Sequence, residues 1–111
     1  MILIIRERAT PEELEEILKE WGVFIKIAVD IEREILAGGS QKHYECEQEL
    51  LKDGSKQRDI WGADWNPYTQ KIFFESIINI RPSQNNRNME IQSPDIREKV
   101  AQITLRLLGG L

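Results

Sequence analysis

The clearest indication of the fold is the alternating stretch Val23-Phe24-Ile25-Lys26-Ile27-Ala28-Val29-Asp30. Every second residue of it is a β-branched aliphatic residue, so one side of the extended chain is apolar. This alternation is typical of a strand in an antiparallel sheet that packs one face against the core. A charged turn follows, and residues 35–37 are predicted to return as a hairpin partner that ends at Gly38-Gly39. We therefore expect an antiparallel sheet at the centre of the fold.

Two segments carry strong signals for helix starts. In the first, Thr10-Pro11-Glu12-Glu13, Thr10 is the predicted N-cap and Glu13 completes a capping box. Its apolar stripe consists of Leu14, Ile17, Leu18 and Trp21, and Gly22 is predicted to end the helix. In the second, Ser93-Pro94-Asp95, Ser93 is predicted to cap a helix that ends at Gly109-Gly110. A third helix is predicted from Ser40 to about Lys52.

The remaining apolar runs predict three further strands. Residues 2–5 form a short run that indicates a central strand, residues 58–65 a fourth strand, and residues 71–80 the longest strand. The resulting order is β-α-β-β-α-β-β-α. It predicts an α+β fold of the split β-α-β type, with a mainly antiparallel sheet and the helices on one face. The length of 111 residues suits one domain spanning residues 1–111.

The predicted sheet has a second face that three helices do not easily cover. It would carry Phe24 and Phe73, together with Ile60 or the Trp61/Trp65 pair according to the register. An open apolar face usually marks a contact surface, so we expect a homodimer with twofold symmetry. A homodimeric interaction module without a small-molecule ligand is therefore one hypothesis for the function.

The composition limits the classes of function. The formal net charge is −4, which argues against bulk nucleic-acid binding. No apolar run approaches the roughly 20 residues that span a bilayer, so we expect no membrane association. Cys46 is the single cysteine, which excludes an internal disulfide and fits a cytoplasmic location.

The best candidate for a binding site is the polar loop that begins at Arg81 and precedes the last helix. Residues 79–111 hold five Lys/Arg against three Asp/Glu, whereas residues 1–55 hold seven against thirteen. Guanidinium groups bind phosphate through paired hydrogen bonds, and neutral side chains of the loop suit a base edge or a sugar. The alternative is a solvated loop whose Asn side chains satisfy their own turns, with Arg81 paired to an acid such as Asp59. The predicted ligand-binding residues are Lys56, Arg58, Arg81, Ser83, Gln84, Asn86 and Arg87.

These residues favour a non-enzymatic binding module for a small anionic ligand such as a nucleotide or dinucleotide. We predict no catalytic residue, no metal and no cofactor. His43, Cys46 and Glu47 share a helix face and are zinc-ligand types, but the sequence offers no second Cys or His to close a site. A weaker hypothesis is a metal-assisted hydrolase that uses Asp30 and Glu32.

Two motifs support a family resemblance, GSKQRDIWG at residues 54–62 and INIRPSQNNR at residues 78–87. With them, nearly the whole chain resembles a family of small, uncharacterised bacterial and cyanobacterial proteins described as a domain of unknown function. The resemblance implies a cytoplasmic protein of about this length with a split β-α-β type fold, and it implies no reaction. The positions it singles out are Lys56, Gln57, Asp59, Trp61, Gly62, Arg81, Pro82, Ser83, Gln84 and Arg87.

Overall fold

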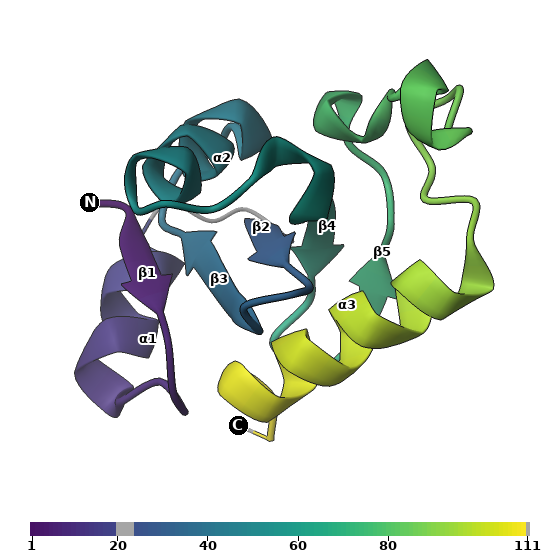
Figure 1. The fold of residues 1–111 in the computed structure, drawn as a ribbon. Helices are drawn as coiled ribbons and strands as arrows, with labels where there is room; N and C mark the ends of the chain where they lie inside the picture. The colour runs from purple at the N-terminus through teal and green to yellow at the C-terminus, as the bar shows by residue number, and fades with distance from the viewer. Residues whose placement is uncertain (20–23, 111) are drawn as a thin grey trace.

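The computed structural model describes residues 1–19 and 24–110, which form three α-helices and a five-stranded antiparallel sheet (Figure 1). The strands are β1 (Leu3–Ile5), β2 (Ile25–Asp30), β3 (Ile35–Gly38), β4 (Ile60–Trp65) and β5 (Ile72–Phe73). The helices are α1 (Pro11–Leu18), α2 (His43–Lys52) and α3 (Pro94–Leu107). Three 3₁₀ turns complete the list: η1 (Gln57–Asp59), η2 (Ile77–Asn79) and η3 (Pro82–Gln84). The predicted α+β class and the predicted order of elements are confirmed.

The sheet order β1-β3-β2-β4-β5 contains two interlocked split β-α-β units. β1 and β2 are both antiparallel to β3, which lies between them, so they run parallel to each other and are joined through α1. β3 and β4 flank β2 in the same way and are joined through α2. The split arrangement predicted from the sequence is therefore present twice.

The helices do not all lie on one face, so that part of the prediction is wrong. α1 and α3 pack on the face that carries Ile27 and Val29, whereas α2 packs Cys46 and Leu50 on the opposite face against Ala28. Crossovers between parallel strands are almost always right-handed. The two crossovers step the same way across the sheet, but they start from β1 and β3, which are antiparallel. If both crossovers are right-handed, α1 and α2 must therefore lie on opposite faces of the sheet.

The predicted helix starts follow local capping chemistry. The Thr10 hydroxyl accepts from the Glu13 N–H at 3.1 Å, and the Glu13 carboxylate accepts from the Thr10 N–H at 2.9 Å, which is the expected capping box. Ser93 caps α3 by accepting from the Ile96 N–H at 3.3 Å. α2 begins three residues after Ser40, whose hydroxyl accepts from the backbone N–H of Lys42. Trp21, Gly22 and Val23, which belong to the predicted end of α1 and start of β2, lie outside the described residues.

Three predicted strands differ from the structure. The strand at residues 2–5 is an edge strand rather than a central one, because β1 pairs with β3 alone. The strand at residues 58–65 begins at Ile60, since η1 occupies residues 57–59. The predicted long strand at residues 71–80 is wrong, because β5 spans only Ile72–Phe73. Ser76 ends the extended segment by accepting from the Ile78 N–H and starting η2.

The two faces of the sheet differ in how completely they are covered. Trp61 and Trp65 are buried in the core beneath α1 and α3, and Ile60 lies under α2. Phe24 and Phe73 meet edge to face, with ring centroids 4.8 Å apart. Phe73 stays exposed, so the far end of the α2 face is only partly covered. None of the described helices combines the length and apolar composition needed to cross a bilayer.

Candidate functional site

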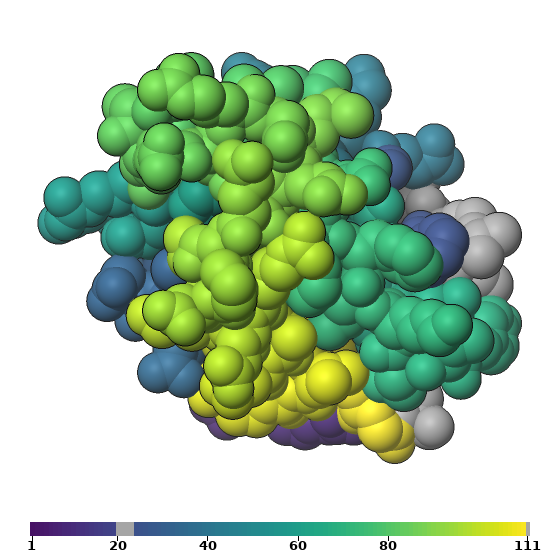
Figure 2. All heavy atoms as spheres, turned by 90° about the vertical axis from the view of Figure 1, so that its right-hand side faces the viewer, coloured from purple at the N-terminus to yellow at the C-terminus, as the bar shows by residue number. Residues whose placement is uncertain are grey.

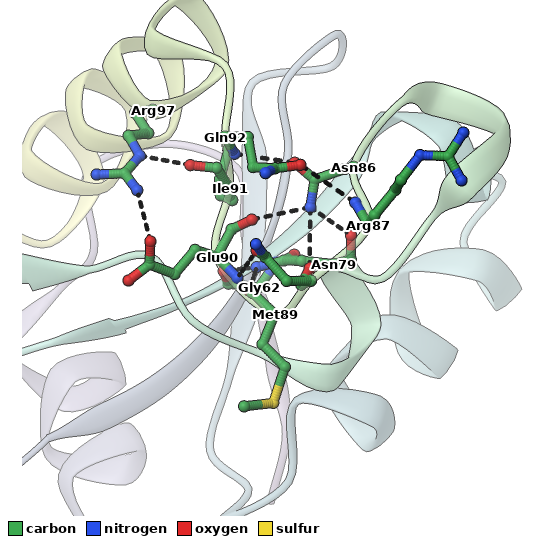
Figure 3. A network of polar contacts seen from close by, with 10 residues as sticks. Gly62, Asn79, Asn86, Arg87, Met89, Glu90, Ile91, Gln92 and Arg97 are labelled. Atoms are coloured by element: carbon green, nitrogen blue, oxygen red, sulfur yellow. Dashed lines mark hydrogen bonds and ion pairs between the residues drawn. The ribbon is translucent and has the colours of Figure 1, made fainter.

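β5 pairs with β4 only at Asp64 and Trp65. Along the rest of that edge of β4, side chains take the place of a strand. The Asn79 amide donates to the Gly62 carbonyl at 3.0 Å and accepts from the Gly62 N–H at 2.8 Å, so it imitates a paired strand residue (Figure 3). It also donates to the Met89 carbonyl at 3.1 Å. Gly62 allows this approach, because a Cβ at that position would lie 2.5 Å from the Cβ of Ser76. The segment after β5 therefore docks tightly on β4.

Asn86 holds the polar loop together from inside. Its amide nitrogen lies within 2.8–3.1 Å of the carbonyl oxygens of Asn79, Asn88 and Glu90, and its oxygen accepts from the Gln92 N–H at 2.9 Å (Figure 3). The backbones of Asn86 and Arg81 also pair in both directions. The Asn86 side chain is buried and its polar groups are engaged, as the alternative interpretation of the loop predicts for its Asn residues. This residue shapes the loop instead of facing solvent.

Arg81 is also used inside the protein. It is only 8% exposed, and its guanidinium donates to the carbonyls of Ile60, Gln57 and Ile78, the last two at 2.7 and 3.2 Å. The same group lies 4.4 Å from the centroid of the Trp61 ring, a cation–π geometry. Burial lowers the pKa of Arg81, and the charges of Glu47 and Asp59 oppose that shift. Most of its donors are therefore committed to the fold.

Arg81 and Gln84 fasten the polar loop to η1. The Arg81 guanidinium donates to the carbonyl of Gln57, the first residue of η1, and to that of Ile60, the residue after it. The Gln84 amide donates to the Arg58 carbonyl at 2.9 Å. The loop thus fixes the backbone from which Lys56 and Arg58 project. The predicted proximity of the two segments is observed, but it arises through backbone contacts.

Lys56 and Arg58 line one surface groove of about 530 Å³, which we call the Lys56–Arg58 groove. Its volume lies within the range of small-molecule sites. Cations outnumber acids by three to two among the residues that line it. These residues are Glu32, Arg33, Gly54, Lys56, Arg58 and Asp59.

The cations of the groove differ in how free they are. Arg33 donates to Asp53 and to the Ser55 hydroxyl, each at 2.7 Å. Arg58 lies 3.9 Å from the carboxylate of its neighbour Asp59, a loose contact at an exposed position. Lys56 is exposed and forms no ion pair within residues 1–19 and 24–110. Lys56 and Arg58 are therefore the groups able to meet an added anion.

Ser83 and Arg87 lie elsewhere on the loop. Both are exposed, and the Arg87 guanidinium points away from the Asn86 network (Figure 3). In the space-filling view, residues 80–93 form the upper part of one face above α3 (Figure 2). Within the described ranges, no hydrogen bond or ion pair joins the Arg87 side chain to Lys56 or Arg58. The structure thus gathers Lys56, Arg58, Arg81 and Gln84 around η1, and leaves Ser83 and Arg87 outside that cluster.

Several of the candidate metal ligands are buried, and Asp30 is engaged in hydrogen bonds. Cys46 is fully buried, and burial raises the pKa of its thiol to about 12. Burial likewise raises the pKa of Glu47. Asp30 is buried and accepts from the N–H groups of Glu32 and Arg33, as in an Asx turn. Across the part of the chain that the structure describes, no three His, Cys, Asp or Glu side chains are placed to hold a metal ion.

Sequence reasoning missed a second hollow, where α2 begins. The His43 Nε2 lies 2.8 Å from the Asp64 carboxylate and 3.0 Å from the Ala63 carbonyl, beside Lys26 and Ile77. Twenty-one positions separate His43 from Asp64, so no local spacing pattern links them. The signal that could have found the hollow is the apolar segment 77–80, which the sequence analysis assigned to a strand.

The fold and its loop network define a small α+β protein built from two split β-α-β units with a side-chain-completed sheet edge. The chain belongs to the family described as "Protein of unknown function (DUF5674)", whose model matches residues 3–107. The resemblance to an uncharacterised family, a domain of unknown function, is thus confirmed. No curated protein matches the chain, and no solved structure matches it.

Proposed function

We propose that this protein is a binding module for a small anionic ligand, most specifically a nucleotide, held in the Lys56–Arg58 groove. The observation that carries the proposal is the convergence on one hollow of two exposed cations, Lys56 without an ion pair among the described residues and Arg58 with a loose one to Asp59. Charge-assisted hydrogen bonds from such groups to phosphate oxygens are among the stronger polar contacts available to a protein.

The acids of the groove favour a nucleotide over a bare phosphate. Glu32 and Asp59 line the same hollow, and carboxylates accept hydrogen bonds from sugar hydroxyls. A ligand with a phosphate at one end and hydroxyl groups at the other matches both kinds of side chain. An inorganic phosphate uses the cations alone and gains nothing from the acids.

The polar loop supports the groove from behind. Arg81 and Gln84 hold η1 in place through its carbonyl groups, so they act as positioning residues. Asn86 holds the loop itself. Ser83 and Arg87 are exposed on the same loop. They remain proposed contacts for a dinucleotide, because such a ligand is long enough to extend beyond the groove.

Calorimetric titration with ADP and with inorganic phosphate tests the proposal. We expect ADP to bind more tightly than phosphate, and Lys56→Gln and Arg58→Gln each to weaken ADP about fivefold, as the loss of one exposed charge contact implies. Lys71→Gln is the matched control, because Lys71 is an exposed lysine outside the groove. Equal ADP affinity in all three variants, or no binding by the native protein, would refute the proposal.

A second candidate, a homodimeric interaction module, is favoured by a separate observation. Four large apolar side chains between residues 73 and 89 are exposed, namely Phe73, Ile77, Ile80 and Met89. Contiguous exposed apolar patches mark contact surfaces, and this candidate takes the four side chains as parts of one such patch. Sedimentation analysis over a range of concentrations should then show a dimer that Ile80→Ser weakens. A monomer at every concentration would exclude it.

A further inference from the structure

A second hollow, of about 300 Å³, lies between the first turn of α2 and η2, over the partly covered end of the sheet. We call it the Tyr44 pocket. It is separate from the Lys56–Arg58 groove and shares no lining residue with it. The residues that matter for its chemistry are Lys26, Lys42, His43, Tyr44, Ile77 and Ile78.

The walls of this pocket are mainly apolar. Ile77 is 75% exposed and Tyr44 is 54% exposed, so both side chains present apolar surface to solvent beside the pocket. Ile78, the next residue, is partly buried and packs against the apolar cluster beneath α2, whereas Ile77 is exposed on the same turn. An aliphatic side chain and an aromatic ring that line one hollow suit the apolar body of a small molecule.

The polar groups of the pocket favour a negative head group. Asp64 is the nearby acid, and its carboxylate is engaged by His43 at 2.8 Å and by Lys26 at 3.9 Å. His43 Nε2 also lies 3.0 Å from the Ala63 carbonyl, so this nitrogen carries the proton and serves as a donor. Asp64 is therefore paired with Lys26 and hydrogen-bonded by His43, and the residues that line the pocket include two lysines and no acid.

Lys42 then supplies the unpaired charge. It is exposed at the edge of the pocket, and within the described ranges its ammonium group forms no ion pair. The pocket thus combines apolar walls with an uncompensated cation. A ligand with an apolar body and one anionic end complements both features, whereas a purely polar anion such as phosphate complements only one.

We propose that the Tyr44 pocket binds small carboxylic acids with an apolar, preferably aromatic, body. The site is distinct from the proposed nucleotide groove and does not depend on it. The volume sets an upper limit, because a hollow of this size is at the lower end of known ligand sites. Ligands of about one ring and a short chain are therefore the class expected.

A matched pair of probes tests the proposal, phenylbutyrate and phenylbutanol, which share a skeleton and differ in the head group. Both are titrated into isotope-labelled protein while backbone amide shifts are followed by NMR. We expect saturable shifts at residues 41–44 and 76–78, with phenylbutyrate binding more tightly than the alcohol. Lys42→Gln should weaken phenylbutyrate about threefold and leave phenylbutanol unchanged, since it removes one exposed charge contact. Ile77→Ser should weaken both about fivefold through lost apolar contact.

Lys56→Gln is the control, because Lys56 lines the other groove, and it should leave both probes unaffected. Equal binding of the two probes, or insensitivity to Lys42→Gln and Ile77→Ser, overturns the proposal. If neither probe binds and dilution of the protein alone moves the same amides, the occupant is a second copy of the chain and the small-molecule site is wrong. Failure of ADP to bind the groove has no bearing on these outcomes.

Discussion

The side-chain amide of Asn79 forms two hydrogen bonds with the backbone of Gly62, one in each direction, at 2.8 and 3.0 Å. Arg81 adds a third contact along the same edge of β4, to the Ile60 carbonyl. A strand edge buried without partners is costly, because each unpaired backbone group loses its contact with water. Two side chains thus replace a strand along the part of β4 that β5 does not pair with, and the first three predictions concern this edge.

Asn79→Ala should lower the free energy of unfolding by about 3 kcal/mol, since it leaves the buried N–H and carbonyl of Gly62 unpaired. Urea denaturation measures the change. Asn88→Ala is the matched control, because Asn88 is an exposed loop residue whose side chain accepts one hydrogen bond, from the Glu90 N–H. We expect the control to cost under about 1 kcal/mol. Similar losses in the two variants would show that the edge contact is not special.

Gly62→Ala should destabilise the protein by about 2 kcal/mol, because the new methyl group meets Ser76 at 2.5 Å. Ser76→Gly relieves that overlap, at the cost of the cap on η2. The Gly62→Ala change should therefore cost less in a Ser76→Gly background than in the native protein. A double-mutant cycle by chemical denaturation measures this coupling, and simple additivity would contradict the close packing of β4 and Ser76.

Arg81→Lys should lower the free energy of unfolding by about 2–4 kcal/mol, although the charge is kept. A lysine has one compact ammonium group and cannot reach three separate carbonyls as the guanidinium does. Arg87→Lys is the control at an exposed position of the same loop and should change stability by less than about 0.5 kcal/mol. Thermal and urea unfolding of both variants give the comparison. An Arg81→Lys protein as stable as the control would refute the structural role.

Asp53 should make stability depend on pH in the acid range. Hydrogen bonds from Arg6 and Arg33 lower the pKa of its carboxyl from 3.8 to about 2. Because the pKa is lower in the folded state, the stabilisation is complete above the ordinary value of 3.8 and is lost as the pH falls from there towards about 2. Asp53→Asn should therefore be less stable than the native protein at neutral pH, with a difference that disappears near pH 2. A difference that stays constant over this range would contradict the assignment.

The parts of the fold that could be predicted from sequence are those set by local chemistry. Each helix cap involves residues at most three positions apart, as in the capping box of Thr10 and Glu13 and the cap of Ser93. Both helices start where predicted. The alternation in residues 23–30 identified β2 from its period alone. The split β-α-β arrangement followed from the order of elements.

The predictions were wrong where contacts between residues far apart in the sequence determine the structure. The apolar pattern of residues 71–80 suggests a strand, but Ser76 and Asn79 hydrogen-bond in ways that favour a 3₁₀ turn docked on Gly62. Helices on both faces follow from the handedness of two crossovers, which no local pattern shows. For the site, the sequence predicted one set of seven residues, of which the structure gathers Lys56, Arg58, Arg81 and Gln84 around η1 and leaves Ser83 and Arg87 outside. The sequence could not show that Arg81 is buried, because its acceptors at Gln57 and Ile60 lie more than twenty positions away.

The most direct test of the central proposal is an amide-shift titration of the labelled protein with ADP. We predict saturable shifts at residues 54–59, which include both cations of the Lys56–Arg58 groove, and we predict that the Lys56→Gln/Arg58→Gln double variant weakens ADP binding about 25-fold, the product of the two single effects. An unchanged ADP affinity in the double variant, or shifts confined to the Tyr44 pocket, would contradict the groove as the binding site of the ligand.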